Sequence, residues 1–265
     1  MNLAFHTVVK KKNINFDLNK FKKFKDKIEH IIIEDNPKNL EKVQDNLKKN
    51  LVSKMILRSN SVKRINHQRD QIIKGLEEAK DQDIIMYSDN DEIPNLKGIK
   101  FDSIKEKIIL FKQKIFYYKF NLLYPKLNWY GTKCCRYKDL KKISWLRDIK
   151  TKKYPFYRID VLFSDLKFIN LKIIENGGWH FSNLKNPEEL LRKYLNDEMH
   201  AEFEQREIDI NNIKDFINRK VINYDHFANQ KSDRQNNEFN LKKITNDHLP
   251  EYVINNYEKY KDWFD

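Results

Sequence analysis

The chain has 265 residues, of which 40% are hydrophobic and 13% aromatic, so it can form one sizeable packed core and is not a wholly disordered protein. Its formal net charge is +13, and the excess comes from lysines spread along the whole chain. Because no arginine-rich arm, zinc finger or aromatic RNA-binding pattern is present, we expect a solvated basic surface and no nucleic-acid partner.

The sequence also lacks the marks of a membrane or secreted protein. No apolar run reaches the roughly 20 residues of a membrane-spanning helix, and the N-terminus has no signal-peptide pattern. The two cysteines, Cys134 and Cys135, are adjacent, and we expect both to be reduced thiols on a strand. We therefore expect a cytoplasmic protein without a membrane span.

The predicted elements of the first half alternate between strands and helices. The apolar run over residues 83–87 directly follows a predicted helix, which is typical of an interior strand of a parallel sheet with both faces covered. Other segments in this half are a buried strand over residues 27–34, helices over 38–49, 61–79 and 140–149, and aromatic, antiparallel strands over 107–123 and 129–137.

The second half continues with a strand over residues 166–174 that leads into a turn at Gly177-Gly178. Helices are predicted from Asn186-Pro187 to about residue 203 and over 210–218, followed by a polar loop over 229–240. A C-terminal helix over 249–265, from Pro250 to Phe264, has one apolar side and should dock on the body. The whole order predicts a single α/β domain over residues 1–265, with a mixed sheet flanked by helices.

Two aspartates follow the strand predicted over residues 83–87, in the segment Ser88-Asp-Asn-Asp-Glu-Ile-Pro94. Ligands of open α/β sheets bind at the carboxyl ends of strands. Asp89 and Asp91 can converge on one ion if the chain turns there, and their hard oxygens suit Mn²⁺ or Mg²⁺, with substrate phosphates as further ligands. The alternative is an ordinary Asx-rich turn before Pro94.

Several segments carry a family resemblance. They are His67-Gln-Arg-Asp-Gln-Ile-Ile-Lys-Gly-Leu76, Tyr87-Ser-Asp-Asn-Asp-Glu-Ile-Pro94, Trp129-Tyr-Gly-Thr132, Trp145-Leu-Arg147, Gly177-Gly-Trp-His-Phe-Ser182, His200-Ala-Glu202 and Leu249-Pro250. In this order, over roughly residues 28–264, the chain resembles glycosyltransferase family 17, which includes the bisecting β-1,4-mannosyl-glycoprotein N-acetylglucosaminyltransferases. Asp70 stands where the family usually has Asn.

The resemblance implies a single-domain, GT-A-like (Rossmann-like) fold and an inverting, Mn²⁺-dependent transfer of N-acetylglucosamine, or a related sugar, from a UDP-sugar to a glycan acceptor such as an N-glycan. The Asp-x-Asp motif, Asp89 and Asp91, would hold the metal. Family members usually begin with a strand and a helix that precede the matched region, and we expect this chain to lack that N-terminal strand.

An inverting transfer needs one base to deprotonate the acceptor hydroxyl, because a metal can neutralise the leaving diphosphate. Glu202, Glu175 and Glu92 are the candidate bases, with Asp197 a further carboxylate nearby in sequence. Each is more often a plain surface carboxylate. Glu202 has the motif match, and Glu175 lies beside the glycine pair.

The candidate donor- and substrate-binding residues each have a structural alternative. Arg69 can bind a phosphate bidentately or make a surface salt bridge. Trp129 and Trp179 can stack on a sugar or fill the core. His180 can bind a phosphate, acceptor or metal, or sit satisfied in the core. Ser182 and His200 join them through their motifs.

Two other functions are also consistent with this sequence. A metal-dependent phosphoesterase would use the acidic turn without needing a sugar acceptor. A basic, non-catalytic module that binds glycan or nucleic acid would use the positive charge instead.

Overall fold

The computed structural model describes residues 3–6, 28–31, 62–196, 209–228 and 237–265. The chain divides into two compact units. Unit 1 contains residues 1–47, 62–113 and 130–178, and unit 2 contains the remainder. Each unit combines strands with helices, so the predicted α/β class with a mixed sheet is confirmed. The prediction of a single domain stays a prediction.

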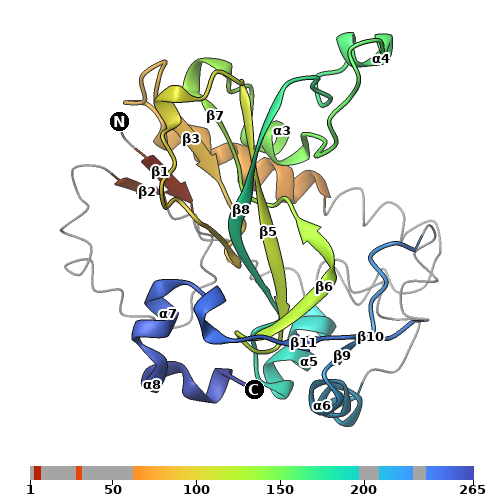
Figure 1. The fold of residues 1–265 in the computed structure, drawn as a ribbon. Coiled ribbons are helices and arrows are strands. Elements are labelled where there is room, and N and C mark those ends of the chain that lie inside the picture. Colours follow the sequence, from red (N-terminus) through yellow and green to blue (C-terminus); the bar gives the residue numbers. More distant parts are fainter. Residues whose placement is uncertain (1–2, 7–27, 32–61, 197–208, 229–236) are drawn as a thin grey trace. The chain divides into compact units, whose positions relative to one another are not determined.

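The sheet of unit 1 contains a parallel group at one end and antiparallel strands beyond it (Figure 1). Strand β1 (Leu3–His6) lies between β2 (Ile28–Ile31) and β3 (Ile84–Tyr87), parallel to both. Strand β7 (Lys133–Arg136) runs antiparallel to β3 on one side and to β5 (Ile108–Tyr117) on the other. The sequence predicted β2 and β3. It did not predict β1, and the expected lack of the family's N-terminal strand stays a prediction.

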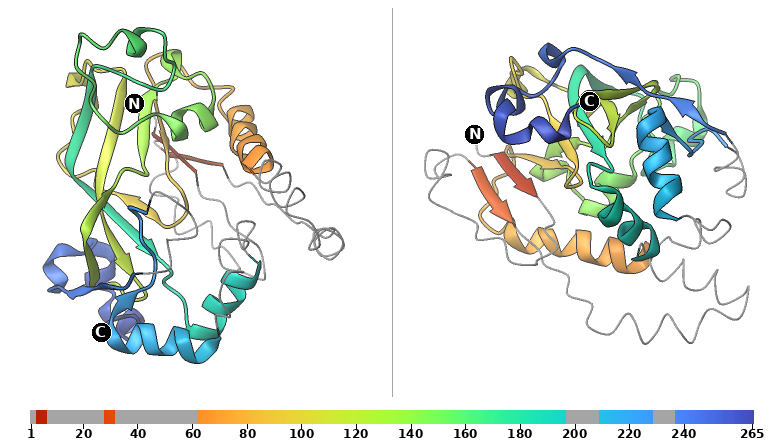
Figure 2. Two further views of the ribbon diagram at one scale, coloured as in Figure 1. Left: turned by 90° about the vertical axis from the view of Figure 1, so that its right-hand side faces the viewer. Right: turned by 90° about the horizontal axis from the view of Figure 1, so that it is seen from below.

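Strand β3 is buried on both faces, as its uninterrupted apolar run predicted. Ile85 and Tyr87 belong to one core cluster, and Ile84 and Met86 to another. The first cluster includes Ile72 and is covered by the helix of residues 62–75 and by α3 (Ile143–Asp148), as Figure 2 shows. The second is covered by the segment around the 3-10 helix η3 (Phe101–Ser103).

The adjacent cysteines of β7 alternate between these two clusters, Cys135 in the first and Cys134 in the second. Both are buried free thiols, as predicted. Burial raises the pKa of both thiols, of Cys135 to about 12, so neither is a reactive thiolate at neutral pH.

The glycine pair Gly177-Gly178 lies inside a strand, not in a turn as predicted. Strand β8 (Leu171–Ser182) pairs with β4 (Glu92–Pro94) and β5. A Cβ on Gly177 would lie 2.5 Å from the backbone nitrogen of Lys112, and one on Gly178 would lie 2.1 Å from the carbonyl oxygen of Ile93. Only glycine allows these strands to cross so closely, and Gly178 has the predicted positive φ of 122°.

Unit 2 packs a few short strands against two helices. Helix α5 (Pro187–Asn196) starts at the predicted proline, and the Asn186 side chain accepts a hydrogen bond from the Glu189 backbone at 2.8 Å. Further elements of this unit are β6 (Leu122–Trp129), α6 (Ile210–Arg219), β9 (Val221–Ile222), β10 (Phe239–Asn240) and β11 (Lys242–Lys243). Because β10 pairs with β9, the predicted polar loop of residues 229–240 ends in a strand.

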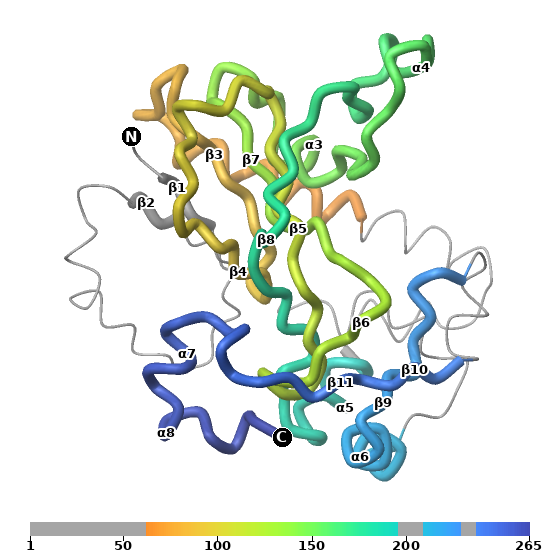
Figure 3. Tube along the Cα trace, in the orientation of Figure 1, coloured from red at the N-terminus to blue at the C-terminus, as the bar shows by residue number. Residues whose placement is uncertain are grey.

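The C-terminal segment docks on the core of unit 2 as predicted, but not as one helix. It forms α7 (Glu251–Asn255), α8 (Tyr257–Tyr260) and a final 3-10 turn, with a break at Asn256. Val253 is buried in a cluster with Phe120 and Phe181. Figure 3 shows the backbone of this C-terminal segment in blue. The helix predicted over residues 38–49 lies outside the described residues.

Three smaller elements complete the described fold: the 3-10 helices η4 (Tyr137–Asp139) and η7 (Asn246–His248), and α4 (Ile159–Leu162). None of the helices in the described part of the chain has the length and apolar character needed to cross a membrane.

Candidate functional site

The acidic turn follows β3 and is closed by Glu92. The backbone nitrogen of Glu92 donates to the carbonyl oxygen of Asp89 at 3.1 Å. In return, the Glu92 carboxylate accepts a hydrogen bond from the Asp89 backbone nitrogen at 2.9 Å. Glu92 is buried, so its carboxylate fixes the shape of the turn and is poorly placed to take a proton from an acceptor.

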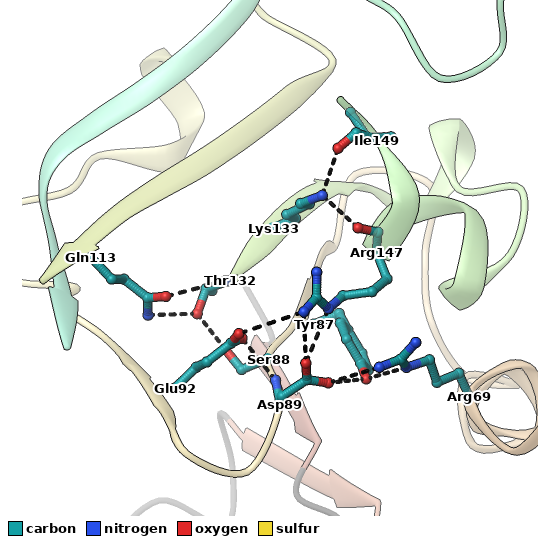
Figure 4. A network of polar contacts seen from close by, with 10 residues as sticks. All are labelled: Arg69, Tyr87, Ser88, Asp89, Glu92, Gln113, Thr132, Lys133, Arg147 and Ile149. Atoms are coloured by element: carbon teal, nitrogen blue, oxygen red, sulfur yellow. Dashed lines mark hydrogen bonds and ion pairs between the residues drawn. The ribbon is translucent and has the colours of Figure 1, made fainter. Parts of the chain in front are cut away.

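The carboxylate of Asp89 is surrounded by donors (Figure 4). Its Oδ2 accepts two hydrogen bonds from Arg147, from Nε at 3.1 Å and Nη2 at 2.9 Å. Its Oδ1 accepts from the hydroxyl of Tyr87 at 2.6 Å and from Nη2 of Arg69 at 3.4 Å. Four donors and two positive charges therefore meet at one carboxylate.

The charges of this cluster shift the pKa values of its members. Burial pushes the pKa of Asp89 upward, but the neighbouring Arg147 and Arg69 outweigh it, so the pKa lies below its ordinary value. Burial, followed by the nearby Asp89 charge, raises the pKa of Tyr87. Burial lowers the pKa of Arg147, but the negative charges of Asp89 and Glu92 raise it by more, so this pKa lies above its ordinary value. At neutral pH Asp89 is therefore an anion, Tyr87 a neutral donor and Arg147 a cation.

The helix of residues 62–75 contributes to this cluster through two consecutive side chains. Arg69 donates from Nε to the Tyr87 hydroxyl at 2.9 Å, in addition to its contact with Asp89. Asp70 points to α3 instead, where it accepts hydrogen bonds from the Ser144 backbone nitrogen at 2.9 Å and from the Ser144 hydroxyl at 3.0 Å. Asp70 thus caps the helix that carries Arg147.

Lys133 holds the other end of α3, although no sequence pattern distinguishes it from the other lysines. Its ammonium nitrogen donates to the carbonyl oxygens of Arg147 at 2.5 Å and of Ile149 at 2.6 Å. Burial, followed by the nearby Arg147 charge, lowers the pKa of Lys133 to about 7. Because both hydrogen bonds go to helix-end carbonyls, we interpret Lys133 as a structural cap and not as a base.

The segment Trp129-Tyr-Gly-Thr132 supports the turn from the side of β7. A Cβ on Gly131 would lie 1.7 Å from Oε1 of Glu92, so only glycine leaves room for that carboxylate. The hydroxyl of Thr132 lies 2.6 Å from the hydroxyl of Ser88 and accepts from the amide of Gln113 at 2.9 Å. Gly131 and Thr132 of this motif therefore pack against the acidic turn.

Two further predicted site residues belong to unit 1. Asp91 is half-buried within the same turn. Glu175 lies on β8, where its exposed carboxylate makes a salt bridge to Lys112 at 2.7 Å. An open cavity of about 770 Å³ in this unit, lined by residues 103–107 with Phe168, Asn170 and Lys172, contains none of the predicted site residues.

The other predicted site residues belong to unit 2. The rings of Trp129 and His180 lie with centroids 4.9 Å apart and planes at 38°. The indole nitrogen of Trp179 donates to the carbonyl oxygen of His248 at 2.7 Å. Ser182 forms a hydrogen bond to the hydroxyl of Tyr117. His200 and Glu202, together with Asp197, lie outside the described residues.

The hydrogen-bond donors around Asp89 limit how this carboxylate could bind the predicted metal ion. Both oxygens of Asp89 already accept hydrogen bonds, and a divalent cation beside them would face two guanidinium groups. Among the residues that the structure describes, no three His, Cys, Asp or Glu side chains form a group that could hold a metal ion. A cation here would therefore depend on Asp91 and on oxygens of a substrate, which is how Mg²⁺ often binds with phosphates.

Searches among protein-family models, curated proteins and solved structures found no match to this chain.

Proposed function

We propose that this chain is a metal-dependent inverting glycosyltransferase with a GT-A-like fold. It would move N-acetylglucosamine, or a related sugar, from a UDP-sugar to a glycan acceptor. The observation that carries the proposal is the convergence of Arg69 and Arg147 on the acidic turn at the carboxyl end of β3. That end of a parallel strand is where α/β proteins bind their ligands.

In the proposed site the two arginines bind the diphosphate of the donor. A guanidinium group matches the geometry of phosphate oxygens, and it stays charged at every relevant pH. Asp89 orients both side chains before the donor arrives, and the caps from Asp70 and Lys133 fix the helix of Arg147. Preorganised positive charge of this kind stabilises a leaving diphosphate, because little rearrangement is needed during the reaction.

The metal in this proposal is Mn²⁺ or Mg²⁺. Asp91 would be its protein ligand, and Asp89 would act through the arginines that it orients. When bound, such an ion acts as a Lewis acid on the diphosphate oxygens. The base for the acceptor hydroxyl is then Glu202 or Glu175, because Glu92 is buried and used by the turn.

Calorimetric titration with UDP and UDP-N-acetylglucosamine, with and without Mn²⁺, tests the proposal. We expect binding that strengthens at least tenfold with Mn²⁺, and loss of this enhancement in Asp91→Asn. Asp102→Asn, an exposed aspartate of η3, is the matched control and should bind as the unaltered chain does. Absence of UDP binding under all conditions, or an Mn²⁺ enhancement that Asp91→Asn retains, contradicts the assigned site.

Two assays separate the competing functions. Metal-dependent hydrolysis of bis(p-nitrophenyl) phosphate without any sugar acceptor would indicate a phosphoesterase. Nucleic-acid binding that weakens steeply with salt, without affinity for UDP, would indicate a basic binding module.

A further inference from the structure

Unit 1 carries an apolar arm, which we define as residues 150–168. It connects α3 to β8 and includes the single-turn helix α4. Figures 1 and 3 show it as a looped segment that extends outside the sheet of this unit.

The arm presents an unusual set of side chains to solvent. Phe163, Phe156, Tyr157, Leu162 and Ile159 are 87%, 82%, 71%, 70% and 69% exposed. Every other large hydrophobic side chain in the described part of the chain is 65% exposed or less. These five residues lie within eight consecutive positions of the chain, and exposed apolar side chains concentrated in this way normally mark an interaction site.

Polar contacts hold the arm together and join one end of it to α3, while its large apolar side chains face outward. Asp160 makes salt bridges to Arg158 and Lys167, each at 2.6 Å. At the other end of the arm, the carbonyl oxygen of Asp165 accepts a hydrogen bond from the indole of Trp145 at 2.8 Å, and Val161 is buried. The large apolar side chains therefore face solvent on a segment that salt bridges and the hydrogen bond to Trp145 hold in shape.

The charges of the arm are unbalanced toward positive. It contains five basic and two acidic residues, a net charge of +3. Asp160 is paired within the arm, and Asp165 pairs with Lys141. The exposed lysines Lys150, Lys152 and Lys153 precede the aromatic pair Phe156-Tyr157 in the chain. The arm therefore combines an apolar tip with a basic flank.

We propose that the apolar arm binds the surface of an anionic lipid bilayer. Aromatic and aliphatic side chains insert at the boundary between headgroups and acyl chains, while lysines on the flank contact the anionic headgroups. A bilayer is the partner that offers both features to a protruding segment: an apolar interior and a negatively charged face. This proposal does not depend on the proposed enzymatic function.

Co-sedimentation of the full chain with vesicles tests the proposal. Vesicles of equal parts phosphatidylcholine and phosphatidylserine should bind the chain, and vesicles of phosphatidylcholine alone should bind it far more weakly. The double variant Phe156→Ser/Phe163→Ser should lose at least tenfold in binding to the anionic vesicles. Each of Lys152→Ser and Lys153→Ser should lose on the order of fivefold. The matched control is Leu195→Ser/Phe227→Ser, which removes two exposed hydrophobic side chains of unit 2 and should bind as the unaltered chain does.

Insertion can be measured separately from electrostatic attraction. Cys134 and Cys135 are buried, so Phe163→Cys places one reactive thiol in the arm for an environment-sensitive fluorophore. A blue shift and stronger emission on adding the anionic vesicles, retained at high salt once bound, are expected. The same label at Phe227→Cys should not respond.

Three results would overturn the proposal. Vesicle binding that the Phe156→Ser/Phe163→Ser variant retains would assign the attraction to the general lysine surface. Absence of binding to anionic vesicles would remove lipid as the partner. Concentration-dependent self-association that the same variant abolishes, without vesicle binding, would assign the patch to a second copy of the chain.

Discussion

At the scale of single residues, the two aspartates of the acidic turn have different surroundings. Asp89 is neutralised by Arg69 and Arg147, and Asp91 is half-buried in the same turn. We expect Asp89→Asn to destabilise the chain by about 1–3 kcal/mol, because two part-buried cations lose the carboxylate that they share, and among the described residues only Arg147 keeps a second one, Glu92 at 3.9 Å. Asp91→Asn should cost less, since Asp89 still pairs with both arginines. Urea unfolding of the two variants measures the difference.

The stability that Asp89 contributes should depend on pH with a definite sign. The pKa of Asp89 is lowered in the folded chain, so its contribution to stability is present above the unfolded pKa of about 4 and is lost as pH falls through the folded pKa. The cost of Asp89→Asn should therefore shrink on acidification. A cost that stays constant from neutral to acidic pH would show that the charge of Asp89 is not what holds the arginines.

Gly131 offers a second test at this scale. An added methyl group would overlap the Glu92 carboxylate, so Gly131→Ala must displace a buried side chain that closes the turn. We expect a cost of about 1–3 kcal/mol. In a Glu92→Ala background the space is empty, and the same substitution should cost much less. Urea unfolding of the four chains of this double-mutant cycle gives the coupling, and additive costs would contradict the proposed packing.

At the scale of elements, the sequence predicts best where a pattern is local. The apolar run of β3 and the Asn186-Pro187 start of α5 both lie where predicted. Strand β1 was not predicted, because its sequence Leu-Ala-Phe-His has only three consecutive apolar residues, without the alternation or the longer apolar run that marks a strand. The glycine pair of β8 was predicted as a turn, because a local pattern does not reveal that other strands cross it closely.

The close approach of β4 and β8 at Gly178 can be tested by substitution, with Gly98 as the control. Gly178 and Gly98 both have positive φ, 122° and 76°. A Cβ at Gly178 would meet the Ile93 carbonyl, whereas a Cβ at Gly98 would meet nothing within 4 Å. Gly98→Ala should thus report only the backbone cost of about 1 kcal/mol, and Gly178→Ala should cost several times more. Equal losses in thermal unfolding would show that backbone conformation, and not the crossing, requires glycine.

At the scale of the whole molecule, the sequence predicted the α/β class but only part of the candidate site. Asp89 and Arg69 stood out because their types and spacing point to chemistry. Arg147 appeared only within a family motif, and Lys133 did not appear at all. Nothing local distinguishes a lysine that will be buried from the many lysines on the surface, because its burial is decided by the packing of α3 against β7.

Lys133 should be visible in the stability of the entire chain as pH changes. The pKa of Lys133 is about 7 in the folded chain, and its ordinary value of 10.5 applies to the unfolded chain. Between these two pH values the unfolded chain therefore binds more protons than the folded chain. The free energy of unfolding therefore contains a term that rises with pH, by up to about 1.4 kcal/mol per unit. Between pH 7 and about 9 the unfolded chain also loses its thiol protons, which the buried thiols of the folded chain keep, so this term is isolated by comparing the unaltered chain with a variant that keeps both cysteines but lacks the Lys133 amine.

Lys133→Met keeps the aliphatic stem but removes the titrating group and both hydrogen bonds to the carbonyls of Arg147 and Ile149. We expect the unfolding free energy to rise less, or fall more, with pH than in the unaltered chain. We also expect a loss of a few kcal/mol at pH 9, where the neutral amine still donates both hydrogen bonds. Lys142→Met, at an exposed lysine before α3, is the control and should keep the slope of the unaltered chain. Parallel curves for Lys133→Met and the unaltered chain, measured by urea unfolding across this window, would mean that Lys133 remains charged when buried. The helix of Arg147 would then be held by a cation, and the electrostatics of the acidic turn would include a third positive charge.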